Sequence, residues 1–216
     1  MNKNLYARTF DRFVVGVAVG IATPVALGQT VTNGSMTGPP TIGSPPPGWA
    51  SVSVDGDTIP PGGLSGWGTG IPASSNGGTF LAVLNNGGGG LFDAAAQIIS
   101  GFTVGQTYTL NFEFANIGLD SSAASNYANS GFIRANIAGV NLDSPTLAHA
   151  GFGNQQWLSF SGNFVASATM LTLTFSAERS GVGGYAGGVD GVSIVPAPGA
   201  FVLSAISGLA AVRCRR

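Results

Sequence analysis

The feature that most constrains the fold of this chain is a succession of short apolar runs separated by glycine- and proline-rich breaks. The clearest run, Tyr108 to Ala115, alternates apolar with polar side chains, as a β-strand with one buried face does. No stretch between the two ends of the chain sustains an apolar period of about 3.6 residues, which disfavours a helical bundle. The other predicted strands are residues 79–84, 91–100, 131–137, 157–166, 170–177 and 189–195. Because no internal repeat accompanies them, these runs predict a single all-β antiparallel sandwich rather than a solenoid or a propeller.

Charge and composition exclude several classes of protein. Glycine supplies 35 of the 216 residues without a G-X-Y period, so the chain is not collagen-like. Between Gln29 and Val195 eight acidic residues face two basic ones, Arg134 and Arg179, which leaves this stretch six units negative. Such a surface repels phosphate backbones, so we expect no nucleic-acid partner. Cys214 is the only cysteine, so the predicted sandwich has neither an internal disulfide nor a cysteine metal site.

Residues 1–28 have the layout of a secretory signal peptide. Three basic residues precede an apolar run at 13–22, and Ala26-Leu27-Gly28 places small residues at the −3 and −1 positions before Gln29. We therefore expect export through the Sec machinery and cleavage after Gly28. An uncleaved membrane anchor is the alternative, although the apolar run is shorter than the ~20 residues that a spanning helix needs.

The C-terminal segment has three parts in a fixed order. Val195-Pro196-Ala197-Pro198-Gly199 forms a rigid extended step, because proline restricts its own backbone and that of the residue before it. An apolar stretch, Ala200 to Val212, comes next, and the basic residues Arg213, Arg215 and Arg216 close the chain. Arginines after an apolar helix hold that end on the cytoplasmic side of the membrane.

This three-part order resembles the PEP-CTERM sorting signal of bacteria, in its PAP variant. The resemblance implies that the C-terminal helix enters the membrane transiently and that an exosortase-type enzyme processes the chain near the proline motif. It also implies a place at the cell envelope, on the cell surface or in the extracellular matrix, often beside exopolysaccharide. An ordinary tail anchor is the alternative. The chain is thus expected to comprise a signal peptide (1–28), a β-sandwich domain (29–194) and a sorting signal (195–216).

Several phrases of the central region resemble jelly-roll domains of the galactose-binding-like type. They are Asn33-Gly34-Ser35-Met36 with Gly48-Trp49, the entry to a core strand at 102–108, and the closing strand at 189–194. The resemblance implies a jelly-roll sandwich and a structural Ca²⁺ that joins the first strand to the last. Asp190 would be the ligand from the closing strand, and Thr37 stands in place of the early carboxylate. The alternative is that Asp190 only caps a turn.

Other residues are candidates for ligand binding. Asp55-Gly56-Asp57 resembles a fragment of a calcium loop but lacks the remaining ligands of an EF-hand. Trp49, Trp67 and Tyr185 lie in glycine-rich segments, where an aromatic face could stack on a sugar ring. Packing in the core is the alternative for each of these three aromatic residues.

Catalysis is the least supported interpretation. His149 is the only histidine, and the chain has no G-x-S-x-G motif for a nucleophilic serine. A glycosidase would need two carboxylates in one cleft, for which Glu113, Glu178 and Asp120 are the candidates. The sequence therefore predicts an exported, non-catalytic surface or matrix protein with polysaccharide as its candidate ligand. The alternatives are a secreted glycan-active hydrolase and a purely structural display protein.

Overall fold

The computed structural model describes residues 29–64, 70–86, 92–118, 127, 129–151, 154–181 and 183–198. Across these residues the chain forms strands and no helix, so no described segment could cross a membrane as a helix. The strands are β1 (Ala50–Ser51), β2 (Asp57–Ile59), β3 (Phe80–Asn85), β4 (Ala94–Ser100), β5 (Thr107–Asn116), β6 (Gly131–Ile137), β7 (Val140–Asp143), β8 (Leu158–Val165), β9 (Met170–Arg179) and β10 (Tyr185–Pro196).

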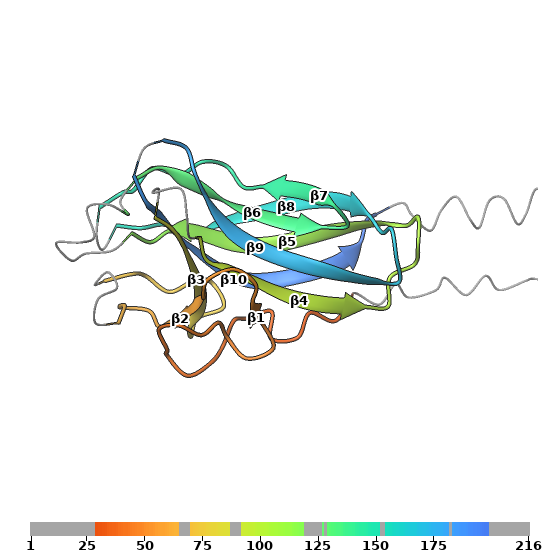
Figure 1. Ribbon diagram of the computed structural model, residues 1–216, viewed down its shortest axis with the longest axis horizontal. Helices are drawn as coiled ribbons and strands as arrows, with labels where there is room; N and C mark the ends of the chain where they lie inside the picture. The colour runs from red at the N-terminus through yellow and green to blue at the C-terminus, as the bar shows by residue number, and fades with distance from the viewer. Residues whose placement is uncertain are drawn as a thin grey trace, which may run out of the picture.

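The strands pair into two antiparallel sheets that face each other (Figure 1). One sheet has the order β2-β3-β10-β5-β8, and the other has the order β1-β4-β9-β6-β7. The late strands lie inside the sheets, because β10 pairs with both β3 and β5 and β9 pairs with both β4 and β6. This interleaved order is that of a jelly roll, and it confirms the predicted all-β antiparallel sandwich.

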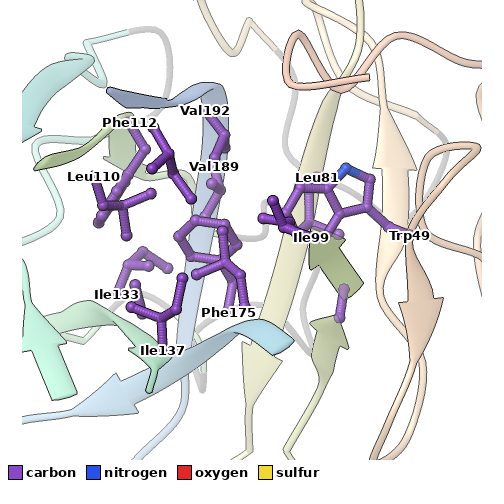
Figure 2. Close-up of a cluster of buried hydrophobic side chains, with 14 of the residues drawn as sticks. Trp49, Leu81, Ile99, Leu110, Phe112, Ile133, Ile137, Phe175, Val189 and Val192 are labelled. Atoms are coloured by element: carbon purple, nitrogen blue, oxygen red, sulfur yellow. The ribbon is translucent and has the colours of Figure 1, made fainter. Parts of the chain in front are cut away.

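The core lies between the sheets and is built by strand alternation. In β5 the side chains of Tyr108, Leu110, Phe112 and Phe114 are buried, as the sequence predicts, while those between them face outward. Phe112 meets Phe175 of the opposite sheet edge to face, with ring centroids 5.1 Å apart. Figure 2 shows these rings among the aliphatic side chains that fill the space between the layers. Aromatic pairs of this kind add about 0.5–1.5 kcal/mol beyond the area that they bury.

A second, smaller apolar cluster lies on the outer face of the β2-β3-β10-β5-β8 sheet. Phe80 packs against Trp157 with ring centroids 5.1 Å apart, beside Ile59 and Ile71. The Trp157 indole N–H donates to the carbonyl oxygen of Pro72 at 2.8 Å. Trp157 also lies over Gly188 in β10, where a Cβ would approach its ring to 2.8 Å. The cluster therefore holds the loop after Ile71 down on this sheet.

The predicted strands agree with the structure except at the short or glycine-rich ones. The run at 131–137 coincides with β6, whereas β1, β2 and β7 are two to four residues long and were not predicted. The last strand begins at Tyr185 instead of residue 189 and continues through Pro196, inside the predicted sorting motif. The predicted signal peptide and the sorting segment from Gly199 to Arg216 lie outside the described residues.

Candidate functional site

An open groove of about 360 Å³ lies on the outer face of β5, β8 and β10, and we call it the polar groove. It lies beside the outer apolar cluster, on the part of the sheet that the loop after Ile71 leaves uncovered. The polar groove is lined by Ser75, Asn76, Asn111, Glu113, Ser159, Ser161 and Gly191, with Phe112 and Phe160 beneath them.

The floor of the polar groove consists of polar pairs between β5 and β8. Since side chains alternate across a strand, every second residue of β5 and of β8 faces outward here. The cross-strand pairs Asn111–Ser161 and Glu113–Ser159 line the groove, and the pair Thr109–Asn163 continues the row beyond it. In this last pair, the Thr109 hydroxyl lies 2.8 Å from the Asn163 side-chain oxygen. These pairs form a continuous row of hydroxyl, amide and carboxylate groups.

One wall of the polar groove is the loop that follows Pro72. The backbone N–H of Ser75 donates to the Glu113 carboxylate at 3.0 Å, and the Asn76 side-chain amide approaches the same oxygen at 3.5 Å. A bulge in β10 brings Gly191 to this wall with φ +60°, a left-handed conformation that glycine adopts without strain. Glu113 is therefore oriented by two donors from this loop.

Asp190 lies beneath this wall and is fully buried. The Ser74 hydroxyl donates to its Oδ2, and the backbone N–H of Gly191 donates to its Oδ1 at 2.7 Å. The pKa of Asp190 is raised to about 6, mainly by burial and to a lesser extent by the nearby Glu113 carboxylate, while these two hydrogen bonds act to lower it. The two acids are register partners in β10 and β5.

The residues around Asp190 do not fit the expected Ca²⁺ site. Its two oxygens are engaged by donors, and the nearby Asn76 amide is a further donor, whereas Ca²⁺ needs six to eight oxygen ligands. Thr37 is exposed, and its hydroxyl bonds within its own turn, 3.2 Å from Ser35 Oγ. Over the described ranges, no group of three acidic, histidine or cysteine side chains could hold a metal ion.

Asp55-Gly56-Asp57 forms an acidic cluster with Asp93. The Asp57 carboxylate accepts a hydrogen bond from the backbone of Gly43, and the Asp93 carboxylate accepts one from Leu84 at 3.0 Å. The pKa of Asp57 is raised to about 6 and that of Asp93 to about 7, mainly by burial and to a lesser extent by the neighbouring aspartates, against the backbone hydrogen bonds, which lower both. Backbone donors rather than ligand oxygens surround these acids, so we assign them a structural role.

Two of the three aromatic candidates belong to the core, so the prediction that they present faces to sugars is wrong. Trp49 is 6% exposed and packs against Phe175 with ring centroids 5.6 Å apart. Figure 2 shows Trp49 turned inward beside Leu81 and Ile99. Tyr185 is fully buried. Gly131 leaves room for the Tyr185 ring, since a Cβ there would lie 2.3 Å from it. Trp67 lies outside the described residues.

The candidate catalytic groups do not share a cleft. Glu113 is on β5 of one sheet, and Glu178 is on β9 of the other, where it pairs with Arg134 at 3.4 Å. His149 lies half-buried beside Gly118, and burial lowers its pKa. Asp120 lies outside the described residues. Glu113 and Asp190 are neighbours, but only Glu113 can be reached from the polar groove.

No protein-family model matches the chain, and no curated protein matches it. Among solved structures, the Stig cyclase Fisc from Fischerella sp. TAU matches with a TM-score of 0.53 and 12% identity, over 81% of this chain and 99% of that one. The carbohydrate-binding module TmCBM61, solved with beta-1,4-galactotriose, has a TM-score of 0.41 and 13% identity, with coverages of 69% and 88%. A CBM4 structure has a TM-score of 0.40 and 16% identity, with coverages of 71% and 97%. At these identities the likeness shows the fold alone, and one fold hosts different functions.

Sequence reasoning missed most of the polar groove. Asn111 and Glu113 alternate with buried residues in the predicted strand 108–115, so their outward direction was visible. Ser75 and Asn76 follow a glycine-rich segment, and nothing in their sequence context shows that they would lie over the distant strand β5. Contacts between distant residues bring that loop into place, among them the hydrogen bond of Trp157 to Pro72, 85 positions apart, and that of Ser74 to Asp190.

Proposed function

We propose that this chain is an exported surface or matrix protein that binds a polysaccharide in the polar groove and does not cleave it. The observation that carries the proposal is the row of outward polar pairs along β5 and β8. The row is formed by regular strand geometry and bordered by an ordered loop, so its groups are held in place before any ligand arrives.

The chemistry of the polar groove suits a neutral sugar polymer. Serine hydroxyls, asparagine amides and the Glu113 carboxylate together offer both donors and acceptors, which matches the hydroxyl groups of a sugar. These side chains are short, so a broad ligand can approach the sheet. Because the groove is open, a polymer can lie along it instead of inserting an end. An anionic ligand is disfavoured, since the groove contains a carboxylate and no lysine or arginine among its lining residues.

We propose that the chain does not cleave the polysaccharide, because too few carboxylates in the described part of the chain are accessible from the polar groove. Glycoside hydrolysis uses two carboxylates on either side of the scissile bond. Asp190 is covered by Ser74, and Glu178 lies on the opposite sheet, so Glu113 has no accessible second acid among the described residues.

Export and sorting are proposed from the sequence of the two ends. The Sec machinery would recognise residues 1–28, and an exosortase-type enzyme would process the chain near Pro196 to Pro198. The test is the intact mass of the protein recovered from each compartment of its native host. We expect a species that begins at Gln29 and ends between Val195 and Pro198. A membrane-bound species that keeps residues 200–216 would instead identify a tail-anchored protein.

Binding is tested by titrating the purified full-length chain with a panel of neutral and acidic polysaccharides. We expect Asn111→Ala to weaken binding about tenfold, because it removes a side-chain amide from the groove floor. Asn141→Ala on β7 is the matched control, since Asn141 is an exposed strand asparagine on the other sheet. Equal affinity of the two variants would overturn the groove assignment. New reducing ends in the titrated polysaccharide would overturn the non-catalytic assignment.

A further inference from the structure

A second concave site, separate from the polar groove, lies at the end of β5 where Asn116 leaves the sheet. This cavity of about 100 Å³, which we call the end pocket, is lined by Asn116, Leu147, Ala148, Ala150, Gln155, Gln156 and Leu158. Glu113 and Asn116 are on opposite faces of the same strand, so the polar groove and the end pocket do not share side chains.

Asn116 presents a buried acceptor with no partner. Its side chain is 3% exposed, and its Nδ2 donates to the carbonyl oxygens of Asn129 at 2.9 Å and Leu147 at 3.1 Å. These two acceptors fix the orientation of the amide, because a flipped amide would direct its oxygen at carbonyl oxygens. The Asn116 Oδ1 atom is thereby left without a donor from any described residue.

Gln155, which also lines the end pocket, has a similar arrangement. Its side chain is 3% exposed, and its Nε2 donates to the carbonyl oxygen of Ile117 at 3.1 Å. Its Oε1 likewise has no donor within the described part of the chain. Buried amide oxygens are almost always hydrogen-bonded in folded proteins, so two unpartnered ones on side chains that line one cavity require an explanation.

The other lining residues restrict the kind of donor that would satisfy these oxygens. Leu147, Leu158 and two alanines form an apolar wall, and the lining contains no charged side chain. A multivalent cation is disfavoured, because it would need carboxylates, and an anion would find no positive charge. A neutral ligand with neighbouring hydroxyl groups and a C–H face fits both the acceptors and the wall.

We propose that the end pocket binds one terminal sugar residue through two neighbouring hydroxyl groups, which donate to Asn116 Oδ1 and Gln155 Oε1. The small volume limits the ligand to a chain end or a branch, whereas the polar groove is open along its length. The inference rests on the end pocket alone and stands whether or not the polar groove binds a polymer.

The test uses the full-length chain and the methyl glycosides of galactose, glucose and mannose as probes. Side-chain amide resonances of Asn116 and Gln155 are followed by NMR during each titration. We expect both to shift with at least one probe, and Gln155→Leu to weaken binding about tenfold through loss of one hydrogen bond. The matched control is Gln106→Leu, which makes the same change at the opposite end of β5 and should leave binding unchanged.

A second variant keeps the test decisive if Gln155→Leu does not fold. Ala148 is exposed and lines the end pocket, so Ala148→Phe should fill it and abolish the shifts without lowering the melting temperature. No shift of either amide with any probe would overturn the proposal and indicate ordered water only. Sugar binding that survives Ala148→Phe but is lost in Asn111→Ala would also overturn it, because the sugar would then occupy the polar groove alone.

Discussion

The backbone N–H of Gln29 donates to the carbonyl oxygen of Ile194 at 3.0 Å. The first described residue therefore pairs with the last strand, one residue before the predicted sorting motif begins. Val195 and Pro196 continue the ladder opposite Thr109 and Tyr108, and the Ala197 N–H donates to the carbonyl oxygen of Thr107 at 3.0 Å. The segment predicted to be processed is thus joined to the sheet without a linker.

This pairing predicts that the position of C-terminal processing affects stability. A chain that ends at Ile194 loses the pairing of Val195 and the Ala197 hydrogen bond, so it should be about 1–3 kcal/mol less stable than one that ends at Pro198. Urea unfolding of the two truncated chains measures the difference. Equal midpoints would mean that residues 195–198 contribute nothing to the sheet.

Trp49 is expected to contribute to stability and not to glycan binding. Trp49→Ala should cost about 3–5 kcal/mol, because it leaves a cavity beside Phe175 and Leu81. Val52→Ala, at a side chain that is 56% exposed, should change stability by less than about 0.5 kcal/mol. Polysaccharide affinity should be the same for both variants under native conditions. A Trp49→Ala variant that unfolds like the wild type would contradict the core assignment.

Tyr185 and Tyr108 are both buried, but removal of the hydroxyl group is expected to change the free energy of unfolding in opposite directions at the two positions. The Tyr185 hydroxyl has no hydrogen-bond partner among the residues that the structure describes, and burial raises its pKa well above the usual value. Tyr185→Phe should therefore raise the free energy of unfolding by about 1 kcal/mol. The Tyr108 hydroxyl accepts the backbone N–H of Thr103 at 2.9 Å, so Tyr108→Phe should lower it by about 1 kcal/mol. Chemical denaturation of both variants tests the two signs together.

The buried aspartates predict that stability falls as the pH rises. The folded pKa values of Asp57 and Asp190 are about 6 and that of Asp93 is about 7, all above the ordinary 3.8. At pH values between the ordinary pKa of 3.8 and these raised values, the folded state binds more protons than the unfolded state. The free energy of unfolding therefore decreases with increasing pH in this range. The pKa of His149 is lowered, so this residue makes the free energy of unfolding increase with pH. Because three aspartates have the opposite effect, we expect the net change to be a decrease.

Thermal unfolding measures this dependence. The melting temperature should be lower at about pH 8 than at about pH 5, and Asp93→Asn should flatten the profile, because its side chain stays neutral throughout. Asp143→Asn is the control, since Asp143 is exposed and pairs with Arg134 on the surface. A melting temperature that increases across this range would show that the three acids are not protonated in the folded state.

The alternation of side chains made the long strands predictable from the sequence. In β5 and β9 apolar side chains recur at every second residue, so the local pattern predicts which side chains face the core and which face outward. Strand β7, with four residues, is too short for alternation to be distinguished from a loop. The first half of β10 contains Gly187 and Gly188, which resemble a turn in sequence but are required by the close approach of Ile133 and Trp157.

The candidate sites were less predictable because they depend on contacts between distant segments. Trp49 and Tyr185 have the local sequence of exposed aromatic residues, and only the packing of the two sheets shows them to be internal. Asn116 and Gln155 have no distinguishing sequence context. Their importance arises from the carbonyl groups of Ile117, Asn129 and Leu147, which orient both amides.

Because β5 and β10 are antiparallel, the two described ends of the chain lie at one end of the sandwich and the end pocket lies at the other. Thr107, Gln29 and Pro196 mark the first end, and Asn116 marks the other, roughly 30 Å away along β5 at ~3.4 Å per residue. A molecule attached to the envelope at its processed C-terminal end, near Pro198, would carry its end pocket at the opposite, outward end. Neighbouring attached copies would then present their end pockets in one layer, at a similar distance from the surface and accessible to the ends of polysaccharide chains.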